Sequence, residues 1–241
     1  MIITFLFDFF FPRECIICGE LLENGSTKNK ALCCSCLEIF PPAYRLPDSG
    51  DHCRICSREL VSEKEICAIC RERKYLFSCN ISLWDYRNKF VRKAIHEYKF
   101  KSKKHASWFF AETIFKLYND NFSNIPVIPA PCSRSRIEKY GWDHMRHICK
   151  ILSRKYGISV FFLFKKRKTR QQKELDYEKR QTELRGRIIL LRKNAAACLK
   201  CSETVILLDD VFTTGATAGY CSELLINNGF KNIIILTIAL D

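Results

Sequence analysis

The segment VILLDDVFTTGATAG occupies residues 205–219 and joins an apolar run to a loop rich in threonine and glycine. The apolar run predicts a buried strand that ends at the acidic pair Asp209–Asp210. The loop after the acids then opens a helix, so its backbone N–H groups and the positive end of the helix dipole can receive a phosphate. The segment therefore predicts a strand, an anion-binding loop and a helix in succession.

The side chains of this loop add to its chemistry. Gly215 permits a positive φ and a close approach of the backbone to a ligand, while Thr213, Thr214 and Thr217 offer hydroxyl donors around an anion. The two carboxylates would repel a phosphate that lay directly on them, so neutral sugar hydroxyls are their natural partners. A ribose 5-phosphate satisfies both halves of the motif, and a chance strand-turn-helix with acidic residues is the alternative interpretation.

Strands and helices alternate through the remainder of the chain from about residue 79. Strand patterns fall at ISLW, IPVIPAP and IIILTIAL, and helical spacing recurs in residues 90–98, 108–118 and 142–152. A further amphipathic segment runs through Leu224, Leu225 and Ile226. This alternation predicts an α/β fold with a mostly parallel sheet flanked by helices. Residues 165–187 are densely charged without an apolar stripe, which favours a mobile excursion or an exposed helix.

Fifteen cysteines form the other conspicuous feature, and most precede residue 80. Four Cys-x-x-Cys pairs can each give two sulfurs to a tetrahedral zinc ion, which predicts two structural sites from Cys15, Cys18, Cys33, Cys36, Cys53, Cys56, Cys67 and Cys70. The alternatives are Cys34 in place of Cys33, a contribution from His52, cross-bracing between pairs, or merely buried thiols. Metal thiolates indicate a reducing compartment, so we expect a cytoplasmic protein whose folding depends on zinc.

Composition sets wider limits. The chain has 241 residues, is 47% hydrophobic and carries a formal charge of +14, so it can bury a core and favours polyanionic partners. The apolar run IITFLFDFFF has no basic region before it, contains Asp8 and is too short to span a bilayer, which favours a docking segment without stable membrane insertion. We expect a double zinc ribbon in residues 1–75 and an α/β domain in residues 76–241.

The acidic-pair loop resembles the phosphoribosyl pyrophosphate motif of type I phosphoribosyltransferases. Together with the paired cysteines, it makes the chain resemble the ComF family of competence-related proteins. IHEYKFKSKK, IPAPCSRSRIEKYGWDHM and TRQQKELDYEKRQTELRG are similar to further family segments, the last through Thr169, Gln172, Leu175 and Arg180. The chain departs from the family pattern at Asp143 and His144, where Asn and Gln are expected after the aromatic Trp142, and at Glu183, which replaces Asn.

The resemblance implies a type I phosphoribosyltransferase-like fold that binds phosphoribosyl pyrophosphate with Mg²⁺. By position, Asp209 and Asp210 would bind the ribose hydroxyls, and Thr213, Thr214, Gly215, Ala216 and Thr217 would cradle the 5-phosphate. Lys99, Ala130, Pro131, Arg134 and Arg136 would contact the pyrophosphate, with further basic groups at Lys165, Lys166, Arg167, Lys168 and Arg170. Any single basic residue can equally be a solvated surface charge. No residue pattern identifies the acceptor of a transferred phosphoribosyl group.

Two other functions compete with a transferase. The family resemblance also implies a role in DNA uptake, and Tyr98, Phe100, Trp108, Tyr140 and Trp142 among basic residues would suit a single-stranded DNA-binding factor. Aromatic residues at helical spacing are more often core. A zinc-ribbon scaffold for a protein of the competence machinery is the third possibility. Histidines 144 and 147 are interpreted as packing or surface residues without a catalytic constellation.

Overall fold

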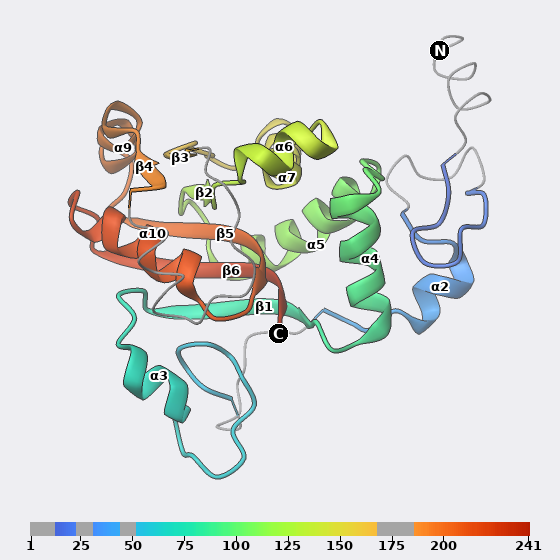
Figure 1. The fold of residues 1–241 in the computed structure, drawn as a ribbon, viewed down its shortest axis with the longest axis horizontal. Helices are drawn as coiled ribbons and strands as arrows, with labels where there is room; N and C mark the ends of the chain where they lie inside the picture. Colours follow the sequence, from blue (N-terminus) through green and yellow to red (C-terminus); the bar gives the residue numbers. More distant parts are fainter. Residues whose placement is uncertain (1–12, 23–30, 44–51, 168–185) are drawn as a thin grey trace.

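A four-stranded parallel sheet lies at the centre of the computed structural model, which describes residues 13–22, 31–43, 52–167 and 186–241 (Figure 1). The strands run in the order β1-β6-β5-β2, with bounds Cys79–Asp85, Asn232–Leu240, Thr204–Phe212 and Val127–Pro129. All three pairings are parallel. The α/β class and the mostly parallel sheet predicted from the sequence are confirmed.

Helices cover both faces of this sheet, as an all-parallel sheet requires. On one face, alternate residues of β5 and β6 such as Ile206 and Leu236 share a core with three helices, α4 (Lys89–Phe100), α5 (Ala106–Asn121) and α7 (His144–Tyr156). On the other face, Val205 and Ile235 share a second core with α9 (Arg192–Leu199) and α10 (Ala216–Ile226). The period-two alternation of the strands thus produces two separate cores.

Smaller elements complete the fold. A short helix, α6 (Arg134–Tyr140), precedes α7, and two antiparallel strands, β3 (Phe164–Lys166) and β4 (Ile188–Leu190), pair beside the sheet. Strand β5 differs from its prediction because it continues past the acidic pair to Phe212, which pairs with Leu240 of β6. The neighbouring strand is long enough to carry β5 beyond the acids, a tertiary effect that the local pattern does not contain.

Each predicted cysteine module packs on a different side of the sheet. The first module, residues 13–22 and 31–43 with helix α2 (Cys34–Ile39), joins the core of α4 and α5 through Phe40, whose ring lies 5.5 Å from Trp84. The second module, residues 52–75 with helix α3 (Ala68–Arg73), joins the opposite core and projects below the sheet (Figure 1). The division of the chain near residue 75 stays a prediction.

Several predictions concern segments that lie outside the described residues. These are the N-terminal docking segment and the basic and family-like residues Lys168, Thr169, Arg170, Gln172, Leu175, Arg180 and Glu183. Within the described ranges, no helix combines the length and the apolar character needed to cross a membrane.

Candidate functional site

The acidic pair lies near the end of β5, where Asp210 is buried and Asp209 is partly exposed. Asp210 Oδ2 is 2.7 Å from Lys99 Nζ, in the last turn of α4, and 2.5 Å from Nε2 of His144, the first residue of α7. Three elements distant in sequence therefore converge on one carboxylate. His144 is 4% exposed, as expected of a packing residue. Its contact with Asp210 was not predicted.

The two neighbouring carboxyls have opposite electrostatics. Burial raises the pKa of Asp210, but the Lys99 ammonium and the hydrogen bond from His144 outweigh burial and hold this pKa well below its usual range. Burial and the adjacent Asp210 charge instead raise the pKa of Asp209 from 3.8 to about 6. Asp210 is thus held in its ionised form within an ion pair, whereas the pKa of Asp209 lies close to neutral pH.

Two adjoining cavities open beside this pair, with volumes of about 440 and 420 Å³. The first is lined by Lys99, Ala130, Pro131 and both acids, and the second follows the loop from Thr213 to Ala218. They share the lining residues Arg136, Lys166, Asp209, Val211, Thr213 and Thr217. The two adjoining cavities, together called the hollow, are therefore lined by most of the predicted site residues.

Basic residues reach this hollow selectively. Arg136 of α6 and Lys166 of β3 line both cavities, and burial lowers the pKa of Lys166. Strand alternation leaves Lys165 and Arg167 exposed. Arg134 is also exposed and lies 3.3 Å from Glu138 on its own helix, so the structure does not bring it to the cavity lining. Arg187, which the sequence analysis did not single out, lines the second cavity.

The predicted phosphate loop has a backbone suited to an anion. Gly215 has φ +71° and is the N-cap of α10, where it has no side chain to occupy the first-turn amides. The Thr214 carbonyl accepts hydrogen bonds of 2.6 Å from both Arg73 Nη1 and the Tyr75 hydroxyl. The second module therefore fixes the loop from behind, a contact that no sequence pattern indicated.

Both cysteine modules are folded in the same way. Each begins with a knuckle closed by an isolated antiparallel bridge, Glu14 with Leu21 and His52 with Glu59. In each, the third cysteine is the N-cap of the short helix that follows. Their sulfurs form two groups of four, Cys15, Cys18, Cys33 and Cys36, and Cys53, Cys56, Cys67 and Cys70.

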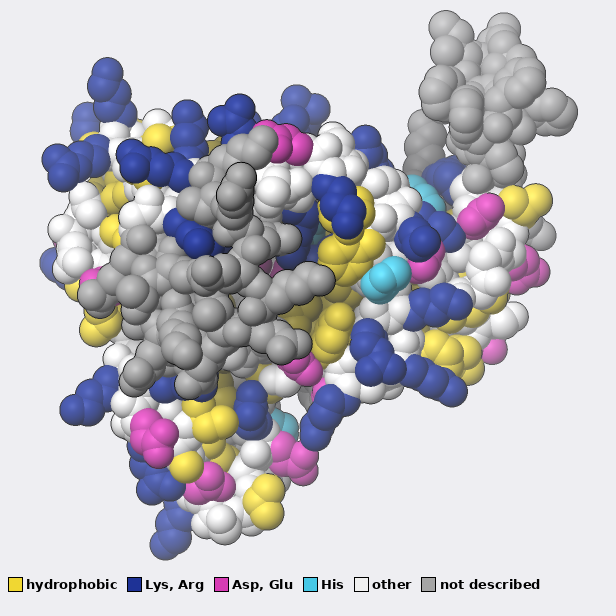
Figure 2. Space-filling model, viewed as in Figure 1, with side chains coloured by type: hydrophobic (Ala, Val, Ile, Leu, Met, Phe, Trp, Pro, Cys, Tyr) yellow, Lys and Arg dark blue, Asp and Glu magenta, His cyan; other side chains and the backbone are white. Residues whose placement is uncertain are grey.

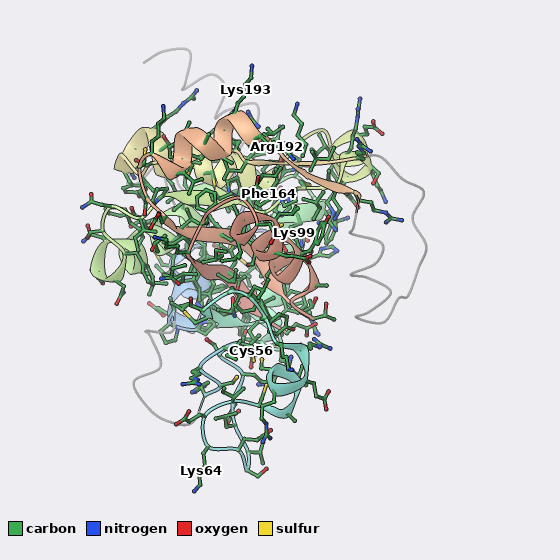
Figure 3. All side chains as sticks on the ribbon, turned by 90° about the vertical axis from the view of Figure 1, so that its left-hand side faces the viewer. Cys56, Lys64, Lys99, Phe164, Arg192 and Lys193 are labelled. Carbon is green, nitrogen blue, oxygen red and sulfur yellow. The ribbon has the colours of Figure 1, made fainter. Side chains whose placement is uncertain are left out.

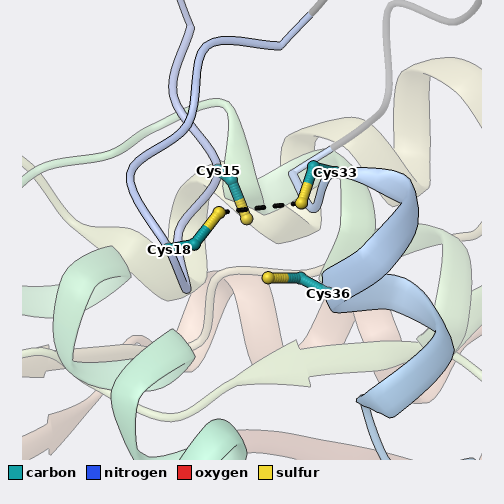
Figure 4. Close-up of side chains that lie close together, drawn as sticks. All are labelled: Cys15, Cys18, Cys33 and Cys36. Atoms are coloured by element: carbon teal, nitrogen blue, oxygen red, sulfur yellow. Dashed lines mark hydrogen bonds between the residues drawn. The ribbon is translucent and has the colours of Figure 1, made fainter.

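The ligand atoms within each group lie within 4.8 Å of one another (Figure 4 shows the first group). Sulfurs are 3.6 Å apart for Cys18 and Cys33, and 3.7 Å apart for Cys56 and Cys67. A tetrahedral zinc with bonds of about 2.3 Å separates its sulfurs by about 3.8 Å, so both groups could hold zinc. The grouping selects Cys33 over Cys34 and excludes cross-bracing and His52 from these groups.

Proton affinities within the second group oppose one another. Hydrogen bonding from Cys70 is the largest influence on Cys56 and lowers its pKa to about 5, whereas the same contact and burial raise the pKa of Cys70 far above its usual range. One thiolate is therefore favoured, and a second is opposed by the first. A bound cation is what would allow all four sulfurs to ionise together.

No family model matches the chain. Among curated proteins, it is 24% identical over 237 residues to the competence protein ComFC of Bacillus subtilis (strain 168), a match that covers 89% of each chain. A solved structure of a hypoxanthine phosphoribosyltransferase from Staphylococcus aureus matches with 14% identity and a TM-score of 0.29 over 61% of each chain. The curated relative confirms the resemblance to the ComF family that the motifs predict.

Proposed function

We propose that the hollow beside β5 binds phosphoribosyl pyrophosphate together with Mg²⁺. The observation that carries the proposal is the arrangement of an acidic pair, an anion-suited loop and basic side chains around two adjoining cavities that share lining residues. A ligand with neutral hydroxyls between two phosphate groups matches that sequence of charges. The similarity to the competence protein ComFC supports a competence-related protein, and the phosphoribosyl ligand is our inference from the site.

The two carboxylates would have unequal roles. Asp210 already accepts from Lys99, from His144 and, at 2.7 Å, from the Val211 amide, so it is well supplied with donors. Asp209 borders both cavities and is the more available acceptor for the ribose 2- and 3-hydroxyls. Asp210 would complete the pair while holding Lys99 in place. We therefore expect Asp209 to contribute more to ribose recognition.

The remaining residues divide by the charge they offer. Thr213, Thr214, Gly215, Ala216 and Thr217 would surround the 5-phosphate at the start of α10. Lys99, Ala130, Pro131, Arg136 and Lys166 would surround the pyrophosphate, where Mg²⁺ would neutralise further negative charge. Arg134 would contact the pyrophosphate only if its exposed side chain moved toward the cavity.

Such a site could also support transfer. The anomeric C–O bond would break, its electron pair would leave with pyrophosphate, and an acceptor nucleophile would form the new bond to the same carbon. Asp209 and Asp210 would hold the ribose, and the basic wall would stabilise the departing pyrophosphate. None of the described residues identifies the acceptor substrate. Ligand binding is therefore the part of the proposal that can be tested first.

A competence factor that binds single-stranded DNA is the second candidate. Lys and Arg side chains extend along the upper rim in Figure 2, and Arg192 and Lys193 stand at the start of α9 in Figure 3. The proposed stacking residues support this candidate less well, because Tyr98 is 0% and Trp142 is 8% exposed. Its partner would be DNA or a competence protein, with the basic rim as the contact surface.

We also propose that both cysteine groups hold structural zinc and that the protein works in a reducing compartment such as the cytoplasm. Eight thiols in two groups of four support this, because four sulfurs close a zinc site. The second module contacts the predicted phosphate loop, because Arg73 and Tyr75 both donate to the Thr214 carbonyl.

Calorimetric titration of phosphoribosyl pyrophosphate with Mg²⁺ into zinc-loaded protein tests the central proposal. Wild type should bind, Asp209→Asn should bind weakly, and Asp120→Asn, an exposed carboxyl on α5, should bind as wild type. Thermal unfolding of each variant confirms that it is folded. A folded wild type that fails to bind refutes the site, and salt-dependent binding of single-stranded DNA by that protein would favour the second candidate.

A further inference from the structure

A third group of metal-ligating side chains lies in the wall of the larger cavity. Cys132, Asp143 and His144 each offer a ligand atom, and these atoms lie within 4.8 Å of one another. Cys132 and His144 line the cavity of about 440 Å³. We propose that these three residues bind a zinc-class transition-metal ion, separate from both tetrathiolate groups and from the Mg²⁺ expected with a phosphorylated ligand.

Backbone structure holds the three residues together. Cys132 lies in the loop between β2 and α6, while Asp143 is the N-cap of α7 and His144 is its first residue. Asp143 Oδ1 accepts from the Arg146 amide at 2.9 Å, which fixes the carboxylate, and no hydrogen bond to its second oxygen comes from the described part of the chain. The Tyr98 hydroxyl donates to the His144 carbonyl at 2.6 Å, so the start of α7 is anchored to α4 as well.

The imidazole has the kind of partner that metal-binding histidines usually have. Its Nε2 is 2.5 Å from Asp210 Oδ2, and an ionised carboxylate accepts the proton of that nitrogen. In the neutral ring Nδ1 then retains the free lone pair, which is the tautomer that a metal requires. Metal-bound histidines commonly donate their other N–H to a carboxylate in this way, which orients the ring and increases its basicity as a ligand.

The ligand types select the ion. Sulfur and imidazole nitrogen favour zinc or cobalt, whereas Mg²⁺ takes oxygen ligands. Three protein ligands leave one tetrahedral position open, and two of these residues line the cavity, so that position would face it. The ion would meet positive charge from Lys99, Arg136 and Lys166, offset by the carboxylates of Asp143, Asp209 and Asp210. A water or a phosphate oxygen is the class of ligand that suits the open position.

Metal counting on the full chain tests this site without any nucleotide ligand. Protein equilibrated with zinc by dialysis should contain three equivalents in wild type, two from the tetrathiolate groups and one from the third group. Cys132→Ser and Asp143→Asn should each contain two. Asparagine keeps the N-cap of α7, so Asp143→Asn removes a charged ligand with little risk to the fold. Cys201→Ser, an exposed thiol outside all three groups, is the matched control and should keep three.

Cobalt substitution supplies a second measurement that does not depend on counting. Cobalt titrated into protein with two zinc equivalents should give a sulfur-to-cobalt charge-transfer band in wild type and in Cys201→Ser, and the band should vanish in Cys132→Ser. Two zinc equivalents in wild type, or an unchanged band in folded Cys132→Ser, would overturn the third site. Neither result bears on phosphoribosyl pyrophosphate binding, which the Asp209→Asn titration tests separately.

Discussion

Gly215→Ala should disturb the phosphate loop both by steric overlap and by backbone strain. A second glycine, Gly157, shows the strain without the overlap. A Cβ at Gly215 would lie 2.7 Å from Phe212 Cζ, 2.7 Å from the Tyr75 hydroxyl oxygen and 3.0 Å from Tyr75 Cζ. The residue also has φ +71°, a conformation unfavourable for alanine. Gly157 has φ +70°, and a Cβ there would meet no atom within 4 Å. Gly157→Ala therefore measures the backbone effect alone.

The expected magnitudes follow from these contacts. The left-handed conformation costs alanine about 1 kcal/mol, so Gly157→Ala should lower the free energy of unfolding by about that amount. Gly215→Ala adds the overpacking of two aromatic rings, about 1–3 kcal/mol, for a total of about 2–4 kcal/mol. Both rings belong to a packed cluster, in which the Tyr75 centroid lies 4.6 Å from that of Phe77, so neither can withdraw freely.

Urea denaturation of the zinc-loaded variants measures this difference, and calorimetry with phosphoribosyl pyrophosphate measures its effect on the loop. Gly157→Ala should retain ligand affinity, whereas Gly215→Ala should lose most of it because the anion-binding backbone is displaced. Gly215→Ala should cost less stability in a Tyr75→Ala background than in the wild type, since two of the three close contacts are then absent. Equal destabilisation by Gly215→Ala and Gly157→Ala would refute the proposed packing of Tyr75 against the loop.

Three further predictions concern charge, the loop contact and the metal. Because the pKa of Asp209 rises from 3.8 to about 6 on folding, stability is lost as the pH rises from about 4 to about 6. Asp209→Asn should therefore raise Tm most at about pH 8, less at about pH 5 and little at about pH 3.5; a gain confined to acid pH would contradict this sign. Tyr75→Phe removes one of the two donors to the Thr214 carbonyl and should cost about 1 kcal/mol of stability in urea denaturation, with weaker ligand binding by calorimetry; unchanged values would show that the hydrogen bond is dispensable. Cys70→Ser should weaken ligand binding more than Cys36→Ser when each has lost only the zinc of its own tetrathiolate group and remains folded, and equal affinities would argue against a link between the second module and the loop.

Local patterns predicted the parts of the structure that depend on neighbours in sequence. The spacing of Val91, Ala94 and Ile95 gave a correct buried face for α4, and four cysteine pairs gave two correct groups of sulfur ligands. The acidic-pair loop was placed correctly between β5 and α10, although the strand extends past the acids. These features follow from residue periodicity and spacing, which a single sequence contains.

Contacts between distant elements could not be predicted in the same way. Nothing near Asp210 in sequence indicates that Lys99 and His144 will contact it. The end of α4 and the start of α7 lie beside β5 only in the tertiary structure. For a similar reason, the two cysteine modules were predicted as one region, residues 1–75. Their repeated Cys-x-x-Cys pairs indicate similar local folds, but their positions depend on which core each hydrophobic surface joins.

The separate positions of the modules give them unequal relations to the candidate site. The first module contacts α5 and its N-cap. The Glu14 carbonyl oxygen lies 2.9 Å from Nε2 of the N-cap residue His105, and Phe40 packs against Phe109 within the helix. In the second module, Cys67 and Cys70 frame the start of α3, and the helix ends at Arg73, which donates to the phosphate-loop carbonyl. A metal at the second group would therefore hold the residues that hold the loop. Its loss would release the Thr214 carbonyl from its donors, whereas loss of the first metal would loosen the opposite core.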